Sequence, residues 1–482
     1  IMSNAISFIL ALINIAAFML PAYGQELPAT GSIKSRIGEL SFEGGYPSDE
    51  TIGKLYDEMD FQRAVQAYLW AIPLVGFAQW QAEHENVFGA KDGDLVYYVS
   101  FKDKLGLLTS NFSTPYIIGF LNLSRTGPLV IDYPAGPTAG GILDFWQRPV
   151  IDLGLTGPDK GKGGKYLLLG PGQSVDNTEG YIVVNSPMNN IMHAFRVLST
   201  DPVEAKKLRE SYLAYPYNKR ENPPRTRIVN PDGRHWEGWQ PRGLDYWKLV
   251  SKMLNEEPVH DRDRMIVAML KPLGIEKGAP FQTDERQKKI LKEASVVGEA
   301  MARSLSYAKR QKEAKLWPGT QWKNAVLLES DQETKHYTSL DERTAWFYEA
   351  VTLTYGMTTK TPGEGQVYIG VQKSKDGNWL MGQNSYTLHV PPNAPVEQFW
   401  AMTLYDTETR CFIDNKHEIA GLDSRKDTIK NQDGSVDLYF GPEPPKGKEK
   451  NWLPTVPERA WLAYYRLYAP SEKYFHRSWK LP

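Results

Sequence analysis

The stretch "PYIIGFLNLSRTGPLVIDYP", residues 115–134, indicates the class of fold. It holds two short runs of aliphatic and aromatic residues, separated by polar residues and the turn-forming pair Gly127–Pro128. Short runs of this composition, bounded by glycine and proline, are typical of β-strands. The stretch therefore predicts two consecutive strands.

Similar runs continue on both sides, from Asp94 to about Arg196. They include "DLVYYVSF", "ILDFWQRPVIDL", "KYLLLGPG" and "GYIVVNS". Many short strands without helices between them favour an antiparallel sandwich or barrel. We expect an N-terminal β-sandwich in this part of the chain.

Helical patterns lie before and after these strands. The first has Ser48 as its expected N-cap and Pro73 as an expected kink, and a later one starts at Asp201 with Pro202 in its first turn. A second strand-rich region closes the chain, and its Asp-Gly pairs at 376–377 and 433–434 are typical of tight hairpins. The order of patterns predicts a multidomain α+β fold that is mainly antiparallel β.

The changes of pattern divide the chain into five segments. They are a signal peptide over 1–24, a loose segment over 25–47, a helix plus β-sandwich over 48–200, a helical segment over 201–320 and a C-terminal β-domain over 321–482. A chain of 482 residues exceeds what one hydrophobic core usually serves, which also favours several domains.

The first 24 residues have the pattern of an export signal. An apolar run from Ile6 to Leu20 precedes Pro21 and a small-residue pattern that ends at Gly24. The run is short for a membrane span and of the right length for a signal peptide, so we expect cleavage after Gly24 and no stable membrane span afterwards. The protein would then be periplasmic or secreted. An uncleaved anchor is the alternative, because no Lys or Arg precedes the run.

Charge and cysteine content exclude some classes of protein. The chain has 56 basic and 57 acidic residues, so no global field draws it to nucleic acid or to an anionic membrane. Cys411 is the single cysteine, which rules out an intramolecular disulfide. Stability must come from packed cores.

Five motifs resemble a known family. They are "AYLWAIPLV", "NFSTPYIIGFLNL" and "GPDKGKGGKYLLLGPG" in the first half, followed by "DGNWLMGQNSYTLHVPPNAPVEQFWAMTLYD" and "RLYAPSEKYFHRSWKLP" in the second. The chain is similar to bacterial exported proteins with two tandem domains of unknown function, numbers twelve-fifty-four and twelve-fourteen. The resemblance implies an N-terminal β-sandwich, a helical segment and a C-terminal jelly-roll. Hydrolysis of phosphorylated inositols has been suggested within that family.

A glycine-rich loop, "GPDKGKGGKY" at 157–166, is the first candidate site. Glycines let backbone N–H groups approach an anion closely, so Lys162 and Lys165 would bind an anionic ligand and Asp159 would orient it. The loop does not fit a Walker A motif, because Tyr166 follows Gly164–Lys165. The alternative is a wide turn closed by glycines.

The stretch "ILDFWQRPVIDL", residues 142–153, is the second candidate site. Strand alternation would place Asp144, Trp146, Arg148 and Asp152 on one face, suited to a ligand groove. The two carboxylates could act as metal ligands, as an acid and base pair, or in a structural salt bridge with Arg148. Pro149 puts this strand at a sheet edge or at a bend.

A third group of lysines lies in "KGKEKNWLPT", residues 446–455. Lys448 could share a rim with Lys162 and Lys165 if the two β-domains face each other, and a solubilised loop is the alternative. Familiar catalytic motifs are absent from the sequence, including the Gly-x-Ser-x-Gly elbow and His-Glu-x-x-His.

These observations favour a hydrolase of phosphate monoesters on a polyol. Asp144, Asp152 and Asp159 would serve as acid, base or metal ligand, and Trp146, Arg148, Lys162, Lys165 and Lys448 would bind the ligand. No cofactor can be named, although a divalent metal is one option. The alternative is a non-catalytic protein that binds an anionic ligand or glycan, or assembles into a surface layer. Either class is compatible with a homo-oligomer.

Overall fold

The computed structural model describes residues 26–426 and 428–482. The predicted signal peptide therefore lies outside the described residues. The described residues divide into two compact units, with the boundary after Phe61. Within the described residues, no helix combines the length and the apolar character that crossing a membrane requires.

The first unit contains a small antiparallel sheet. Its strands are β1 (Gly31–Ser35), β2 (Gly38–Glu43) and β3 (Tyr46–Pro47), paired in the order β1-β2-β3. The prediction of a loose segment over 25–47 is wrong for these residues, because their short polar strands carry too weak an apolar pattern to be recognised. Helix α1 (Asp49–Asn86) starts in this unit, and Ser48 Oγ accepts from the Thr51 N–H at 3.3 Å, as expected of its N-cap.

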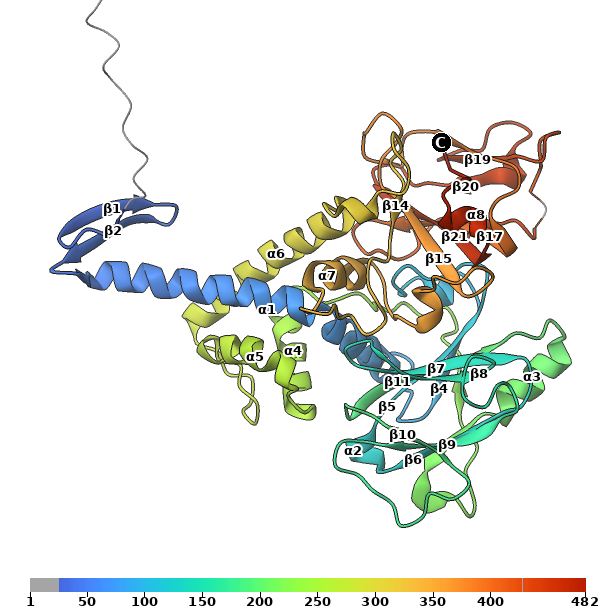
Figure 1. Ribbon diagram of the computed structural model, residues 1–482, viewed down its shortest axis with the longest axis horizontal. Coiled ribbons are helices and arrows are strands. Elements are labelled where there is room, and N and C mark those ends of the chain that lie inside the picture. The colour runs from blue at the N-terminus through green and yellow to red at the C-terminus, as the bar shows by residue number, and fades with distance from the viewer. Residues whose placement is uncertain (1–25, 427) are drawn as a thin grey trace, which may run out of the picture. The chain divides into compact units, whose positions relative to one another are not determined.

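The first half of the second unit is the predicted N-terminal β-sandwich (Figure 1). One sheet has the order β13-β4-β5-β11-β7-β8, with β4 (Leu95–Tyr98), β5 (Tyr116–Asn122), β7 (Thr138–Asp144), β8 (Pro149–Gly154), β11 (Asn190–Val197) and β13 (Ile228–Val229). The other has the order β10-β9-β6-β12, with β6 (Leu129–Tyr133), β9 (Gly164–Leu169), β10 (Ile182–Asn185) and β12 (Leu213–Pro216). Buried Ile117, Ile131, Leu168 and Ile191 form part of the core shared by these strands. Strands β12 and β13 extend the sandwich beyond the expected boundary at residue 200.

The C-terminal part of helix α1 packs on the outer face of the six-stranded sheet. Phe77 and Trp80 meet the ring of Phe120 on β5, with centroids 5.7 and 5.4 Å apart. Pro73 lies inside this helix and has no N–H to donate to Leu69 O. The Leu69 carbonyl instead accepts from Thr344 Oγ1 at 3.3 Å, so the proline site ties α1 to the later helix α7 (Leu340–Glu349).

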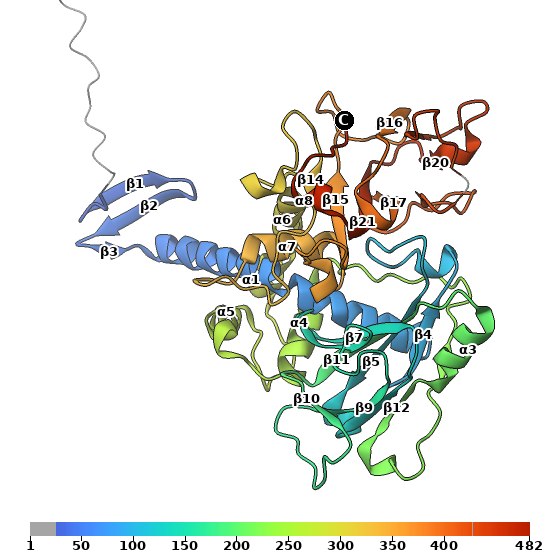
Figure 2. The same ribbon diagram turned by 45° about the vertical axis from the view of Figure 1, so that its right-hand side comes forward.

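A helical segment follows the sandwich, as predicted. It contains α3 (Pro202–Ser211), α4 (Leu244–Glu256), α5 (Arg264–Leu270) and α6 (Glu285–Tyr307). Asp201 accepts from the Val203 N–H at the start of α3, which confirms the expected cap. Figures 1 and 2 both place α6 beside α7 and α4, and Trp247 Nε1 on α4 donates to Leu291 O on α6 at 2.8 Å. The short helices are α2 (Leu123–Thr126) and α8 (Glu472–Phe475), with single 3₁₀ turns at Lys102–Lys104, Tyr217–Lys219, Asp261–Asp263, Lys271–Leu273, Lys312–Ala314, Tyr355–Met357 and Glu449–Asn451.

The C-terminal region is a second pair of sheets. The larger has the order β14-β15-β21-β17-β18, with β14 (Lys323–Asn324), β15 (Gln366–Val371), β17 (Val396–Asp406), β18 (Gly421–Asp423) and β21 (Trp461–Pro470). The smaller has the order β16-β19-β20, with β16 (Tyr386–Val390), β19 (Val436–Gly441) and β20 (Trp452–Pro454). Buried Ile369, Trp400 and Leu438 belong to one core that both sheets share. The chain thus has the multidomain α+β fold that its sequence predicts.

Candidate functional site

A cavity of about 420 Å³ is lined by strands of both β-regions. Its walls come from β5, β7, β8 and β11 of the six-stranded sheet, from β15 and β21 of the five-stranded sheet, and from the loop at 107–111. We call it the intersheet cavity. Residues about 350 positions apart in the sequence meet across it, so only the tertiary fold creates the site.

Small residues form the floor of the intersheet cavity. The strand register places Ile118, Ala194, Gly141 and Asp152 side by side across β5, β11, β7 and β8. Residues in such a row point to the same face of a sheet. A Cβ atom added to Gly141 would lie 3.8 Å from Asp152 Oδ1, so the carboxylate reaches over the glycine. The small side chains leave room for a ligand beside Asp152.

Arg466 on β21 lines the opposite wall. Its side chain is almost fully buried, with 3% of the residue exposed. The guanidinium donates to Tyr405 Oη at 2.7 Å, to Thr403 Oγ1 at 3.3 Å and to the Thr109 carbonyl at 2.7 Å. Among the described residues no carboxylate pairs with it. A buried guanidinium whose hydrogen-bond partners are all neutral has no counter-charge, so a bound anion would stabilise it.

Tyrosine rings surround this arginine. The guanidinium carbon lies 5.3 Å from the ring centroid of Tyr368, 5.7 Å from that of Tyr405 and 5.2 Å from that of Tyr464. Burial lowers the pKa of Arg466, but the neighbouring tyrosine hydroxyls raise it by more, so the pKa lies above its ordinary value. Arg466 therefore stays cationic at any physiological pH.

Arg196 on β11 supplies a second cation. Its half-buried side chain lines the same cavity and makes no hydrogen bond or ion pair with the part of the chain that is described. Burial raises the pKa of Tyr368 and of Tyr468, and both Arg466 and Arg196 oppose that rise. The two guanidinium groups thus act on the same pair of tyrosines, and the cavity concentrates positive charge.

The loop after β4 completes the wall and joins the two β-regions. The Thr109 N–H donates to Arg410 O at 2.7 Å, and Ser110 O accepts from Tyr405 Oη at 2.7 Å. Asn111 N–H donates to Tyr116 Oη at 2.7 Å. Beneath the loop, burial lowers the pKa of Lys104 to about 8, and its ammonium donates to Thr114 O at 2.8 Å. The backbone of this loop is therefore held in place from both sides.

Asp152 is the one predicted catalytic residue that lines the intersheet cavity. Burial raises the pKa of its carboxyl group, and Lys160 works in the opposite direction. A carboxyl group with a raised pKa can hold a proton closer to neutral pH, which a general acid requires.

Asp159 has a structural role in the glycine-rich loop. Its carboxylate accepts from the N–H groups of Gly154 at 2.8 Å and Gly163 at 3.1 Å, and from Tyr166 Oη at 2.5 Å. The loop therefore uses its amides to bind its own carboxylate. This geometry supports the alternative interpretation, a turn closed by glycines.

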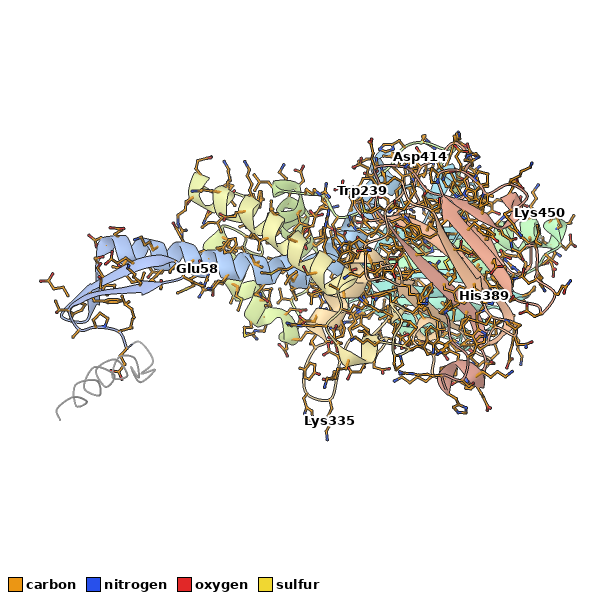
Figure 3. All side chains as sticks on the ribbon, turned by 90° about the horizontal axis from the view of Figure 1, so that it is seen from above. Glu58, Trp239, Lys335, His389, Asp414 and Lys450 are labelled. Atoms are coloured by element: carbon orange, nitrogen blue, oxygen red, sulfur yellow. The ribbon has the colours of Figure 1, made fainter. Side chains whose placement is uncertain are left out.

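The predicted ligand-binding lysines lie apart from the cavity. Lys162 is exposed, and Lys165 Nζ lies 3.9 Å from Asp132 Oδ2 at the surface. Lys448 lies 6.0 Å from the ring centroid of Tyr439, and its neighbour Lys450 projects outward from the C-terminal region (Figure 3). None of the three lysines lines the intersheet cavity.

The stretch 142–153 is a hairpin, so the prediction of one continuous strand face is wrong. Strand β7 ends at Asp144, and Gln147 takes a positive φ of 59° at the turn before β8. Arg148 donates to Glu333 Oε1 at 2.7 Å, and its backbone N–H donates to Asp144 Oδ1 at 3.0 Å. The alternation fails because the turn reverses the chain. Pro149 begins β8, which is an edge strand as expected.

Asp144 and Trp146 are buried at this hairpin. Trp146 packs on Trp70 with centroids 4.8 Å apart, and Arg343 lies 4.8 Å above its ring. Burial raises the pKa of Asp144 to about 6, opposed by its hydrogen bond from Arg148 N–H. Positively and negatively charged side chains lie next to one another at this hairpin, so we interpret the cluster as a structural junction. In the described parts of the chain, no three His, Cys, Asp or Glu side chains are grouped as metal ligands.

Sequence reasoning did not find Arg196 or Arg466. A signal for Arg466 exists, because it is the one charged residue in "WLAYYRLYAP", the strand at 461–470. A charge inside an otherwise apolar strand must be paired or functional, since its burial is costly. Arg196 carries no comparable signal, because its strand ends in mixed polar sequence.

Comparisons with known families agree with this architecture. Residues 97–216 match a family described as a protein of unknown function, DUF1254, and residues 365–472 match a second one, DUF1214. The two domains hold the two walls of the intersheet cavity. The chain thus carries a DUF1254 match followed by a DUF1214 match, in the order that the sequence motifs predicted.

Two solved structures are similar to this chain. The VPA0106 protein from Vibrio parahaemolyticus matches with a TM-score of 0.53 and 15% identity, over 86% of this chain and 96% of that one. An uncharacterised protein from Burkholderia cenocepacia has a TM-score of 0.37 and 12% identity, over 87% of this chain and 94% of that one. No curated protein is similar to the chain. The first likeness supports the fold alone.

Proposed function

We propose that this protein binds a small polyanionic ligand, a phosphorylated polyol, in the intersheet cavity. The observation that carries the proposal is Arg466, which is buried in the cavity wall without a carboxylate partner among the described residues. A phosphate group would supply the missing negative charge and accept from a planar, multi-donor guanidinium.

The other walls fit the same ligand. Arg196 and Arg466 come from different β-regions, so two phosphate groups, or one phosphate between them, can be bound across the cavity. Tyr116 and Tyr468 line it beside them and suit the hydroxyl groups of a polyol. The volume of about 420 Å³ lies within the range of roughly 300–1,000 Å³ that is common for small-molecule sites.

Hydrolysis of a phosphate monoester is a second candidate function, favoured by Asp152. Its carboxyl group lines the cavity with a pKa raised by burial, and it lies on the wall that also carries Arg196. In this role a water molecule would form the new bond to phosphorus as the ester P–O bond breaks, and Asp152 would protonate the leaving alkoxide. The arginines would neutralise the phosphoryl group. Binding without turnover is the simpler function and requires fewer assumptions.

The decisive experiment is calorimetric titration of the purified chain with inositol hexakisphosphate, inositol monophosphate and unphosphorylated inositol. We expect the phosphorylated compounds to bind and inositol to fail. Replacements Arg466→Met and Arg196→Met should each weaken binding at least tenfold, while Lys448→Ala should leave it unchanged. If Arg466→Met and Arg196→Met are both folded and bind the phosphorylated compounds as tightly as the unmodified chain does, the proposal is refuted.

Export and homo-oligomer formation stay predictions. Amino-terminal sequencing of the protein recovered from the medium or periplasm would test cleavage after Gly24, and light scattering would test the oligomeric state.

A further inference from the structure

A second cavity lies inside the C-terminal sandwich. Its volume is about 320 Å³, and it is lined by residues of both the five-stranded and the three-stranded sheet. It shares no lining residue with the intersheet cavity. Ala463 and Trp461 line it, whereas Arg466 and Tyr468 on the same strand line the intersheet cavity, so the two cavities lie on opposite faces of the five-stranded sheet. We call it the aromatic groove.

The inner part of the aromatic groove is apolar. Leu388, Met402 and Phe440 contribute aliphatic and aromatic surface. Trp461 is 3% exposed, stacks on Phe440 at 5.4 Å and meets Tyr386 edge-on at 5.6 Å. This part of the lining favours an apolar segment of a guest molecule, because polar groups placed against it would lack partners.

The mouth of the groove is cationic. Lys373 and Lys375 lie on the loop after β15 and make no ion pair with any described residue. Lys373 Nζ lies 4.4 Å from the exposed ring of Trp379, which holds the ammonium near the opening. Burial lowers the pKa of nearby Lys323, and the charges of Lys309 and Lys373 lower it further. Asp376 is the single acidic residue that lines the groove.

We propose that the aromatic groove binds a single-chain amphiphile with an anionic head, of the fatty-acid class. The tail would lie between the two sheets against Leu388, Met402 and Phe440, and the carboxylate would pair with Lys373 and Lys375. This site is independent of the intersheet cavity. Each methylene that enters the groove should tighten binding about fourfold, until the groove is filled.

The test is calorimetric titration of the full chain with octanoate, decanoate and dodecanoate below their micelle concentrations. We expect affinity to rise from octanoate to decanoate. Dodecanol and dodecyltrimethylammonium carry the same tail as dodecanoate with a neutral and a cationic head group, and serve as comparisons. Lys373→Ala/Lys375→Ala should weaken decanoate at least fivefold and leave dodecanol unchanged. Equal affinity for dodecanoate and dodecyltrimethylammonium would overturn the proposal that Lys373 and Lys375 bind an anionic head group.

Blocking variants locate the tail. Val371→Trp, at the half-buried end of β15, should weaken decanoate at least tenfold, and Leu388→Phe should do the same from inside the groove. Val183→Trp, at an exposed strand position of the N-terminal sandwich, is the matched control and should change nothing. Melting temperatures identify any variant that fails to fold, and the other blocking variant then decides. Unchanged decanoate affinity in a folded blocking variant would overturn the proposal.

Discussion

The guanidinium of Arg466 donates to the carbonyl oxygen of Thr109 at 2.7 Å, across 357 residues of sequence. Thr109 belongs to the loop after β4, and Arg466 to the long strand β21 of the C-terminal region. The hydrogen bond therefore joins the two β-regions at the wall of the intersheet cavity. A ligand that also contacts Arg196 would strengthen the same junction, and binding should raise the melting temperature.

Gly141 should be the position at which the intersheet cavity can be filled without loss of fold. A Cβ there would meet nothing closer than 3.6 Å, whereas a Cβ on Gly140 would lie 2.4 Å from Ala194 O. Gly141→Val should abolish ligand binding with a change of about 1 kcal/mol or less in unfolding free energy. Gly140→Ala should cost about 1–3 kcal/mol. Urea unfolding and calorimetry on both variants measure this, and tight binding by a folded Gly141→Val would contradict the location of the site.

Asp159→Ala should destabilise the protein and spare ligand binding. The substitution leaves the N–H groups of Gly154 and Gly163 and the Tyr166 hydroxyl without their shared acceptor. Buried donors without partners cost about 1–3 kcal/mol each, so a loss of roughly 2–4 kcal/mol is expected after partial relaxation. Lys162→Ala, an exposed neighbour, is the control and should be neutral in urea unfolding. Weaker ligand binding in a folded Asp159→Ala protein would restore the loop as an anion site.

Asp144 should make the protein less stable as pH rises from about 4 to 6. Burial raises the pKa of its carboxyl group to about 6 in the folded state, above the ordinary value of 3.8 for an aspartate. The folded state then binds more protons than the unfolded state in this window, so the unfolding free energy falls with rising pH. The contribution is at most about 3 kcal/mol, at 1.36 kcal/mol for each pH unit.

Asp144→Asn should flatten that slope, because the amide does not titrate. Unfolding free energies at several pH values, compared with the exposed Asp245→Asn control, give the difference directly. A slope identical to that of the unmodified chain would show that Asp144 is ionised throughout the window.

Asp152→Asn separates binding from catalysis. If the protein hydrolyses phosphate monoesters, loss of the proton donor should lower phosphate release about 100-fold or more while affinity for the substrate changes little. Phosphate release and calorimetry on the same preparation test this. Phosphate release that persists in Asp152→Asn would assign the acid to another group, and no release by the unmodified chain would leave ligand binding as the function.

Much of the architecture could be read from local sequence. Ser48, Asp201 and the strand runs at 115–134 each specify their own element, because capping and strand patterning depend on neighbours a few residues away. The prediction that alternate residues of 142–153 share one strand face was wrong. A turn at Gln147 reverses the chain there, and the sequence has no glycine or Asp-Gly pair that would indicate this turn. Asp159 was predicted to belong to a ligand site for a similar reason. The glycine-rich composition of its loop suits anion binding, whether the anion is a ligand or the loop's own carboxylate.

The order of α and β elements, the two β-regions and the likeness to the two tandem domains could be predicted from the amino-acid sequence alone. The candidate site became visible once the folded chain brought distant residues together. Arg466 and Arg196 lie 270 residues apart in the sequence, and no local pattern connects them. They line one cavity because two sheets, each specified locally, pack with a loop between them. Ion pairing and desolvation depend on distances in space, and a linear pattern does not record those distances.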